Sequence, residues 1–402
     1  MHVTSLMDLK KQSTTTEFTH FIQQQGDVFW WEKGNFWVVS KYDYARQVLL
    51  SDDYTCDRSS FFISRMPELN LVLVNDFFDV VSKMMVMSDA PEHTKRRRIC
   101  YHGFGNHSIS QLTPLIQKTI DKGLATLAQK GSIDFVPDFA ETIPSTTLAD
   151  FFNIPETDRM EFYHWSNNMT QFFGGSTSYL DTDGIKVNDS AKALKDYFIN
   201  LVARRRREQG DDFLSVLLTH QEHFGLTDEE IVSQAIMMLV AGQVSTTDQM
   251  CNNLYALLMD PEAKELALKQ PEKLEKILEE CTRLDPAVTF TFRVTKNQTH
   301  IGQQSILPGD VIFISNHAVN RDKAYFSNPD KIDIELNQAK NFSYGFGGHF
   351  CLGAKLARVE MLLCVQSLLQ RFPTLHVDEN KPVVRKHHSL SFSGFQNLPL
   401  KI

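Results

Sequence analysis

The chain of 402 residues lacks the features that mark membrane, secreted and nucleic-acid-binding proteins. No segment approaches the ~18 consecutive apolar residues that a membrane-spanning helix requires. The segment Met1–Gly26 is polar and has no apolar core of the signal-peptide type. Acidic residues outnumber basic ones, 49 to 41, and the net charge of −8 does not favour binding to nucleic acid. We therefore expect a soluble, cytoplasmic protein that binds neither a membrane nor a nucleic acid.

The sequence also has no Pro/Gly/Ser-rich linker, no internal repeat and no CxxC pair among its six cysteines. Without that spacing, a structural zinc site is not indicated, and the cysteines are expected to stay reduced. The length is large for one ordinary domain, but 42% hydrophobic residues can build a large core. We therefore expect residues 1–402 to form a single catalytic domain.

One cysteine has a setting that the other five do not share. Tyr344–Gly353 is a glycine-rich loop with Cys351 near its end, and Leu356, Val359 and Leu363 follow at helical spacing. A thiol just before a helix lies near unpaired backbone N–H groups and the positive end of the helix dipole, which favour the thiolate. A thiolate is the axial ligand of haem iron in enzymes that cleave O₂. The plainer alternative is a structural cysteine beside a glycine turn.

This loop resembles the haem-binding loop of the cytochrome P450 superfamily, with one departure: Tyr344 stands where the family usually has phenylalanine. The resemblance extends over nearly the whole chain. It implies a mainly α-helical fold with small β-sheets and a long central helix over a haem b cofactor. It also implies that Cys351 is the axial ligand of the metal and that the loop residues around it contact the haem. These are Tyr344, Gly345, His349 and Gly353.

The order of predicted elements agrees with that fold. Thr227–Glu230 is a capping box that begins a long helix reaching Met259, where Asp260–Pro261 ends it. A second helix is expected over Glu272–Leu284. Strands are expected within Val28–Val39 and over Val288–Phe292, and a strand pair over Gly302–Ile314.

Two further motifs gain their meaning from the resemblance. His93 and Arg97 lie one helical turn apart; alone they indicate a solvated basic helix. The family implies instead that they bind the haem propionates through charge-assisted hydrogen bonds, together with Arg293 and His349.

Glu280 and Arg283 are spaced to pair on one helix face and, taken alone, indicate a surface ion pair of little energetic value. The resemblance implies a buried structural pair that supports the cysteine loop. In the family an arginine often completes this group, but Leu336 occupies its position here. The triad is therefore either incomplete or recruits another residue.

The centre of the long helix, Leu239–Thr247, departs from the family pattern twice: Val244 replaces an acid and Ser245 replaces a threonine. Ser245 keeps a hydroxyl that can carry protons, so we assign it and Thr246 as catalytic residues. Without the acid we expect a weaker or rerouted proton relay, or a reaction that needs less proton delivery. Gly242 in mid-helix costs about 1 kcal/mol relative to alanine. Either a flat cofactor against the helix or simple packing would explain it.

Five regions resemble substrate-facing parts of the family: Ser59–Val81, Phe162–Tyr179, the helix face of Met238, Ala241 and Gly242, Val288–Phe290 and Gly394–Asn397. The pocket is expected to be apolar with a few polar groups, which suits a mid-sized, partly apolar organic substrate. The residues assigned to substrate contact are Met238, Ala241, Gly242, Val288, Phe290 and Phe395.

The expected electron donor is a separate ferredoxin or flavodoxin with its reductase, because no flavin or iron–sulfur domain is recognised in the chain. A basic surface near the cysteine could attract such an acidic donor. Each of its lysines, taken singly, is better explained as part of a solvated face. The residues are Lys95, Arg96, Arg98, Lys355 and Arg358.

The sequence therefore predicts a haem-thiolate monooxygenase that oxidises a free or carrier-protein-tethered small molecule, in a tailoring step of secondary metabolism. A first alternative is haem-thiolate chemistry without oxygen insertion, such as nitric oxide reduction, peroxide-driven oxidation or oxidative coupling. A non-catalytic haem sensor is a second alternative from another class. Consumption of O₂ driven by an electron donor distinguishes the monooxygenase from the sensor.

Overall fold

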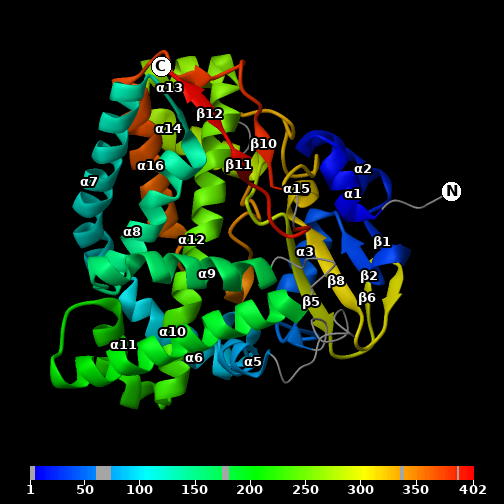
Figure 1. Cartoon of the computed structure of the whole chain (residues 1–402). Helices are drawn as coiled ribbons and strands as arrows, with labels where there is room; N and C mark the ends of the chain where they lie inside the picture. The colour runs from blue at the N-terminus through cyan, green and yellow to red at the C-terminus, as the bar shows by residue number, and fades with distance from the viewer. Residues whose placement is uncertain (1–4, 60–73, 174–180, 336–338, 387–388) are drawn as a thin grey trace. The chain divides into compact units, whose positions relative to one another are not determined.

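The computed structural model describes residues 5–59, 74–173, 181–335, 339–386 and 389–402 and is mainly helical with small sheets, as expected (Figure 1). Its contacts group into two compact units, and each unit combines stretches that are distant in sequence. The first unit contains Met1–Tyr54, Gln117–Ile143 and Ser245–Ile402, and the second contains Thr55–Ile116 and Pro144–Val244. The units are therefore not consecutive domains.

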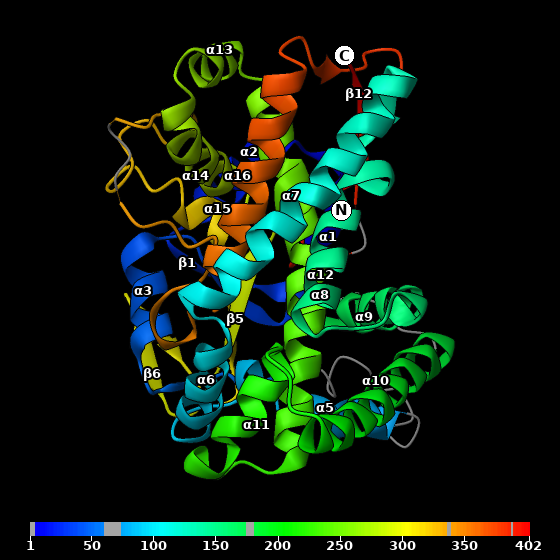
Figure 2. The same ribbon diagram turned by 90° about the vertical axis from the view of Figure 1, so that its left-hand side faces the viewer.

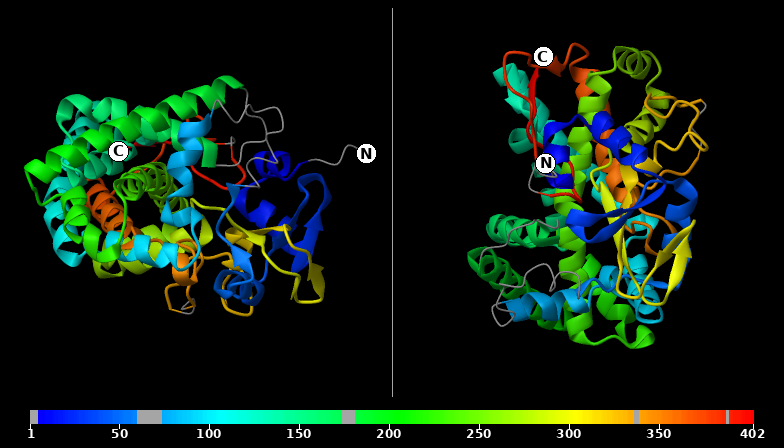
Figure 3. Two further views of the ribbon diagram at one scale, coloured as in Figure 1. Left: turned by 90° about the horizontal axis from the view of Figure 1, so that it is seen from below. Right: turned by 90° about the vertical axis from the view of Figure 1, so that its right-hand side faces the viewer.

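The main sheet of the first unit combines strands from the N-terminal region with strands from the second half of the chain. Its strand order is β1-β2-β8-β5-β3, and Figure 3 (right) shows the N-terminal strands beside the strands from the second half of the chain. β1 and β2 form the expected antiparallel pair, and β2 runs parallel to β8 with Trp37 opposite Ile312. The strands are β1 (Val28–Trp31), β2 (Phe36–Val39), β3 (Tyr54–Thr55), β5 (Phe290–Thr295) and β8 (Val311–Ser315).

The strand pair predicted over Gly302–Ile314 was wrong in its pairing. Two strands are present, but β7 (Gln304–Ile306) pairs with β6 (Thr299–Ile301), whereas β8 pairs with β2 and β5. The turn between them is anchored elsewhere, because Asp310 accepts hydrogen bonds from the Leu307 N–H and the Trp37 indole N–H. Local alternation predicts that a strand forms but not which strand it pairs with.

The long helix α12 (Asp228–Leu258) confirms the prediction from its capping box. The Thr227 N–H donates to Glu230 at 2.9 Å, and the Glu230 N–H donates to Thr227 Oγ1 at 3.2 Å. At its other end, Asp260 caps the next helix, α13 (Pro261–Lys269), through the Ala263 N–H.

Two helices of the first unit pack beside the C-terminal half of α12 (Figure 2). They are α14 (Leu274–Leu284), which confirms the second predicted helix, and α16 (Ala354–Arg371). The Asn253 amide of α12 donates to Thr282 Oγ1 at 2.9 Å and to the Met361 sulfur at 3.2 Å, so one side chain ties the three helices together.

The remaining elements of the first unit are short. They are α1 (Leu6–Gln12), α2 (Thr15–Gln24), α3 (Tyr42–Leu50), α15 (Asn316–Val319), β4 (Ser132–Asp134), β9 (His376–Val377), β10 (Val384–Arg385), β11 (Phe395–Asn397) and β12 (Pro399–Lys401).

The second unit is helical and has an aromatic core. Phe213 stacks on Phe151 with ring centroids 4.6 Å apart and meets Phe152 edge to face. Its helices are α5 (Asn75–Ser82), α6 (Glu92–Gly103), α9 (Arg159–Phe173), α10 (Asp181–Arg207) and α11 (Phe213–Phe224). Three helices have residues in both units: α7 (Asn106–Lys130), α8 (Thr142–Phe151) and α12. Among the described residues no helix is both long enough and apolar enough to cross a bilayer.

Candidate functional site

Cys351 differs from the other cysteines in exposure. It is exposed in the loop three residues before α16 begins, and its N–H donates to the Tyr344 carbonyl at 2.8 Å. The remaining five are buried. Burial raises the pKa of four of these thiols, so they are protonated near neutral pH: Cys100, Cys251, Cys281 and Cys364. A thiol available to a ligand is therefore found at the position that the sequence singles out.

Glycines give the loop its path. Gly345 and Gly347 have φ values of +76° and +72°, which L side chains rarely adopt. A Cβ on Gly347 would lie 2.8 Å from the Leu50 side chain and 3.1 Å from the Leu49 carbonyl oxygen, so the loop packs directly on the end of α3. A Cβ on Gly353 would meet nothing within 4 Å, which leaves open space two residues from the thiol.

The Tyr344 ring lies against a charged group. The Arg358 guanidinium sits 4.4 Å from the ring centroid and binds Glu279 at 2.5 Å. Burial raises the pKa of Tyr344, so its hydroxyl is protonated. That hydroxyl is buried and has no hydrogen-bond partner among the described residues. The departure from phenylalanine therefore adds a buried polar atom to the loop.

The helix after the loop, α16, begins at Ala354 and confirms the helical spacing. Leu356 is buried, whereas Val359 and Leu363 are half-buried. The other buried residues of α16 are Ala354, Glu360, Met361, Cys364, Val365, Leu368 and Leu369.

The Glu280–Arg283 pair lies in the interior, since the two residues are 6% and 1% exposed. The guanidinium binds the carboxylate through two bonds of 2.8 and 2.9 Å. It also donates to the carbonyl oxygens of Asn320, Pro329 and Lys331 at 2.7–2.9 Å. These carbonyl oxygens accept hydrogen bonds from guanidinium N–H groups that would otherwise be buried without a partner. Leu336, the position of the missing arginine, lies outside the described residues.

The centre of α12 contains a short accessible window. Ala241 is exposed and Gly242, Val244 and Ser245 are partly exposed, whereas residues 231–240 and 246–254 are buried. Met238 and Thr246, at 6% exposure each, lie outside the window. Ala241 and Ser245 are one turn apart and share a helix face. Two of the predicted residues are therefore brought together at an accessible surface.

Neither neighbouring polar residue replaces the acid missing at Val244. Gln243 is 2% exposed, and its side-chain oxygen accepts a hydrogen bond from Ser166. The Asp248 carboxylate is 1% exposed and binds the Lys386 ammonium at 2.7 Å. Both side chains are committed to buried contacts.

Gly242 packs closely on the neighbouring helix α8. A Cβ at this position would approach the Leu148 side chain of α8 to 3.2 Å, closer than ordinary van der Waals contact. Close helix packing is therefore one reason for a glycine at this position, and contact with a flat cofactor stays a prediction.

The four cations assigned to the propionates lie in different units. In the second unit, α6 carries His93, which is buried, and Arg97, which is half-buried. In the first unit, β5 carries Arg293, which is 6% exposed and donates to the Phe292 carbonyl at 3.0 Å. His349 is half-buried in the cysteine loop. Their propionate contacts stay a prediction.

The assigned pocket residues of the first unit differ in exposure. Val288 is partly exposed and forms an isolated β-bridge with Phe392. Phe290 is 2% exposed and packs edge to face against Phe18. Phe395 is fully buried, with the Arg385 guanidinium 4.0 Å from its ring centroid. Substrate contact by the two phenylalanines stays a prediction. Residues 60–73 and 174–180, within two expected pocket segments, lie outside the described residues.

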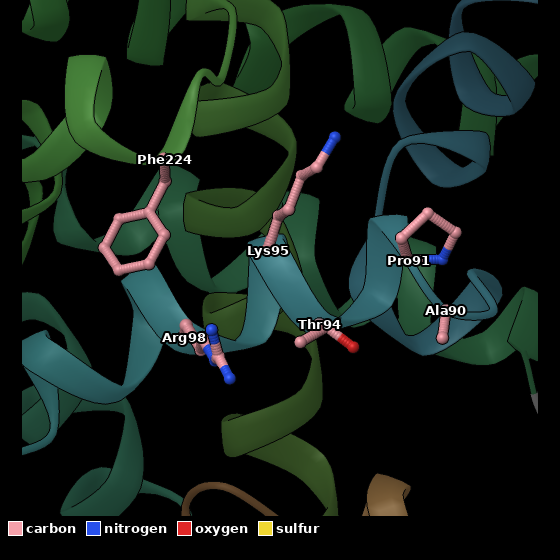
Figure 4. Close-up of a pocket in the computed structure, with 6 residues that line it drawn as sticks. All are labelled: Ala90, Pro91, Thr94, Lys95, Arg98 and Phe224. Carbon is pink, nitrogen blue, oxygen red and sulfur yellow. The ribbon is translucent and has the colours of Figure 1, made fainter.

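The basic residues assigned to the electron donor are partly used in ion pairs. Arg96 is 11% exposed at its side chain and binds Glu230 at 2.8 Å, and Arg358 binds Glu279. Lys95, Arg98 and Lys355 are exposed. A hollow of about 460 Å³ in the second unit is lined by Lys95 and Arg98 of α6 and by Phe224 at the end of α11 (Figure 4). Ala90, Pro91 and Thr94 complete it.

Two residues of α12 that were not predicted as site residues hold the chain directly beside two predicted pocket segments. Gln249 accepts the Ala287 N–H at 2.8 Å, and Asn252 donates to the Ser393 carbonyl at 3.1 Å. The signal was the mostly polar run Thr246–Asn253, which follows a mostly apolar stretch of the same helix, since buried amides must find partners.

The described residues fit a haem in three respects. The loop offers an accessible thiol, Gly353 leaves space near it, and the α12 window offers a partly exposed hydroxyl at Ser245. A thiolate is the ligand type that haem enzymes use to activate O₂.

Comparison with known proteins identifies the family. The cytochrome P450 family model matches residues 2–399. The chain is 28% identical to the polyketide biosynthesis cytochrome P450 PksS of Bacillus subtilis over 91% of this chain and 89% of that protein. It is also 28% identical to mycinamicin IV hydroxylase/epoxidase of Micromonospora griseorubida, over 90% and 89%.

Among solved structures, P450BioI in complex with an acyl carrier protein ligated to hexadec-9Z-enoic acid superposes with a TM-score of 0.87. The identity is 25%, and the match covers 96% of this chain and 98% of that one. The chain therefore belongs to the cytochrome P450 family and is an oxidoreductase of the cytochrome P450 type.

Proposed function

We propose that this protein is a haem-thiolate monooxygenase that tailors a secondary metabolite in the cytoplasm. It inserts one oxygen atom of O₂ into a mid-sized, partly apolar substrate and releases the other as water, consuming two electrons and two protons. The observation that carries the proposal is the exposed Cys351 thiol on its glycine loop. Relatives named for polyketide biosynthesis and for mycinamicin hydroxylation support the substrate class.

Haem b, when bound, would supply the activation of O₂. Cys351 would bind its iron, and the loop from Tyr344 to Gly353 would hold one side of the ring. His93, Arg97, Arg293 and His349 would pair with the propionates through charge-assisted hydrogen bonds. The Glu280–Arg283 pair fixes the carbonyls of Asn320, Pro329 and Lys331 and thereby supports the segment that leads to the loop.

Ser245 would move protons from its place in the accessible window. Its hydroxyl can donate and accept a hydrogen bond, so it can orient a water molecule and pass on a proton. Val244 cannot supply a proton, and Gln243 and Asp248 are held by Ser166 and Lys386. A polar group of the substrate, or water bound to it, would therefore complete the relay.

Product yield tests the role of Ser245. In Ser245→Ala we expect less product per NAD(P)H consumed, because misdirected protons cause electrons to be consumed without oxygenation of the substrate. Ser40→Ala, which alters a buried hydroxyl that donates to the Gly26 carbonyl and lies outside the assigned site residues, serves as the control. An unchanged ratio in Ser245→Ala would show that this hydroxyl carries no protons. Cys351→Ala should abolish oxygenation altogether, and retained O₂-dependent oxygenation would overturn the proposal.

The substrate is proposed to arrive free or bound to a carrier protein. The P450BioI complex with an acyl carrier protein shows that a structurally similar enzyme accepts a tethered acyl chain. Substrate binding would be detected as a blue shift of the Soret band of the ferric protein. A shift with free polyketides, terpenoids, peptides or aromatic acids would identify a free substrate. A shift with acyl-carrier conjugates alone would identify a tethered one.

The proposed electron donor is a ferredoxin or flavodoxin with its reductase. The exposed Lys95, Arg98 and Lys355 can attract an acidic surface, so Lys95→Glu should slow the first electron transfer at low salt.

Chemistry without oxygen insertion is a second candidate, supported by the missing acid at Val244. Turnover with peroxide alone, or reduction of nitric oxide by NADH without a partner protein, would favour it.

A further inference from the structure

The N-terminal helix α1 places one lysine against the C-terminal segment of the chain. An ammonium has three N–H donors, and four oxygen atoms surround the Lys10 ammonium, so each donor can find an acceptor. The acceptors are the carbonyl oxygens of Phe392 at 2.6 Å, Leu390 at 3.0 Å and Ser389 at 3.1 Å, and Thr289 Oγ1 at 3.3 Å. We call Lys10 and these four oxygens the Lys10 clamp.

The clamp spans two chain segments that run side by side without forming a regular ladder. The Thr289 N–H donates to the Ser391 carbonyl and the Ser393 N–H donates to the Ala287 carbonyl, each at 2.8 Å. Between them Val288 and Phe392 form one isolated bridge. With so few backbone bonds, the alignment of these segments depends on the side chains that hold them.

Each end of this paired region has its own anchor. At the Ser393 end, α12 provides it, because Asn252 donates to the Ser393 carbonyl and Gln249 accepts the Ala287 N–H. At the Ser389 end, the Lys10 ammonium provides it, together with the Thr289 hydroxyl, which donates to the Leu390 carbonyl at 2.5 Å. Loss of Lys10 should therefore loosen one end and leave the other in place.

The surroundings of Lys10 contain charges of both signs. Burial lowers the pKa of Lys10 to about 7, and the carboxylates of Asp285 and Asp248 oppose that change, whereas Arg385 adds to it. His317 also lies within electrostatic reach. Experiments on the clamp are therefore best made at pH 6, where the ammonium is protonated.

We propose that Lys10 is a positioning residue for the substrate pocket: its ammonium holds Ser389–Phe392 against Val288–Thr289, the region in which substrate contact is predicted. The clamp itself is independent of the reaction. Its effect on ligand binding rests on the proposed function.

Hydrogen exchange tests the clamp directly on the full-length protein at pH 6. Lys10→Ala should speed exchange in peptides covering Ser389–Phe392 by about tenfold or more, as expected for the loss of hydrogen bonds to a charged group. Peptides from α14 should be unchanged. Lys11→Ala alters an exposed lysine of the same helix and should match the wild type throughout. Wild-type exchange in Lys10→Ala would overturn the proposal.

Chemical rescue separates a specific ammonium from a general loss of structure. Lys10→Ala removes the equivalent of n-propylammonium, so n-propylammonium chloride should restore slow exchange. Tetramethylammonium chloride carries the same charge without an N–H donor and should not. Equal effects of the two salts, or no effect of either, would show that the ammonium is not the holding group. If Lys10→Ala does not fold, Lys10→Met, which keeps an apolar stem, is compared instead, and wild-type exchange in it contradicts the proposal.

Ligand binding tests the consequence for the pocket in the haem-loaded protein. Ketoconazole is bulky enough to reach the pocket walls, whereas imidazole needs only the iron. In Lys10→Ala, affinity for ketoconazole should fall about tenfold, and imidazole affinity should not change. Faster exchange with unchanged ketoconazole affinity would keep the clamp but refute its role in the pocket. Failure of both azoles to bind the wild type would instead count against the proposed function.

Discussion

The two halves of α12 are both buried, but by different physical means. From Ile231 to Val240 most side chains are apolar, although the Gln234 side chain bonds to another segment, at Lys83 and Met85. From Thr246 to Asn253 most are polar, and Asp248, Gln249, Asn252 and Asn253 bind named partners. The accessible window from Ala241 to Ser245 lies between the halves.

The difference shows how one helix can serve two needs. Apolar packing tolerates small shifts, because the free energy depends on buried area and shape rather than on single contacts. Buried hydrogen bonds fix direction and register, because an unpaired buried group is expensive. The polar half therefore fixes the segments after α14 and near the C-terminus, and the apolar half supplies general stability.

The largest expected effect comes from the buried ion pair in the polar half. Asp248→Leu removes a buried carboxylate and leaves the partly buried Lys386 ammonium without its partner, which should cost about 3–5 kcal/mol of unfolding free energy. Urea unfolding followed by circular dichroism measures it. Asp248→Leu combined with Lys386→Met removes both charges and should recover most of the loss. The exposed pair of Lys192 and Asp196 is the control: Asp196→Asn should change stability by less than about 0.5 kcal/mol.

If Asp248→Leu lowers the unfolding free energy no more than Asp196→Asn does, the polar half is not held by directional contacts. The proposed difference between the two halves of α12 would then be wrong.

A second effect should appear on acidification. Burial lowers the pKa of His317 to about 4, and the Asp285 carboxylate 3.5 Å away only partly offsets this. Between pH 6.5 and 4 the unfolded chain binds a proton that the native protein does not, so stability falls as pH falls through this window. The loss should approach about 3 kcal/mol at pH 4. Urea unfolding at pH 7 and pH 4.5 measures it.

This loss should act on the polar half of α12, because the Asp285 carbonyl accepts hydrogen bonds from Gln249 and Asn252. In His317→Gln the loss of unfolding free energy on acidification should be smaller by the contribution of His317. The same slope in variant and wild type would assign the acid sensitivity to other groups.

The smallest effect is expected in the apolar half. Ile236 is fully buried, and Ile236→Val removes one methylene, which should cost about 1 kcal/mol. The loss should be equal at pH 7 and pH 4.5, since no charge is involved. A loss above about 3 kcal/mol, or one that varies with pH, would mean that this half is also held by specific contacts.

Local patterns predicted much of the fold and the centre of the site. The capping box at Thr227 located the start of α12, and the glycine spacing around Cys351 located the exposed thiol. Both are encoded within a few consecutive residues, so a single sequence displays them.

Long-range contacts could not be predicted in this way. The pairing of β2 with β8 and the Lys10 clamp join residues that are separated by most of the chain. Nothing in the residues around Trp37 or Lys10 specifies a partner that far away. For the same reason the buried state of Glu280 and Arg283 followed from the family resemblance and not from their spacing.

The parallel pairing of β2 with β8 has a consequence for the protein while it is being synthesised on the ribosome. Trp37 binds Asp310, a residue 273 positions later in the chain. At about 5–20 residues per second, a ribosome needs roughly 14–55 s to bridge that interval. During this time the aromatic hairpin of β1 and β2 has left the ribosome, and the edge of β2 that will pair with β8 is still open, which favours association between chains. A growing chain of this protein should therefore depend on a holding chaperone until β8 emerges.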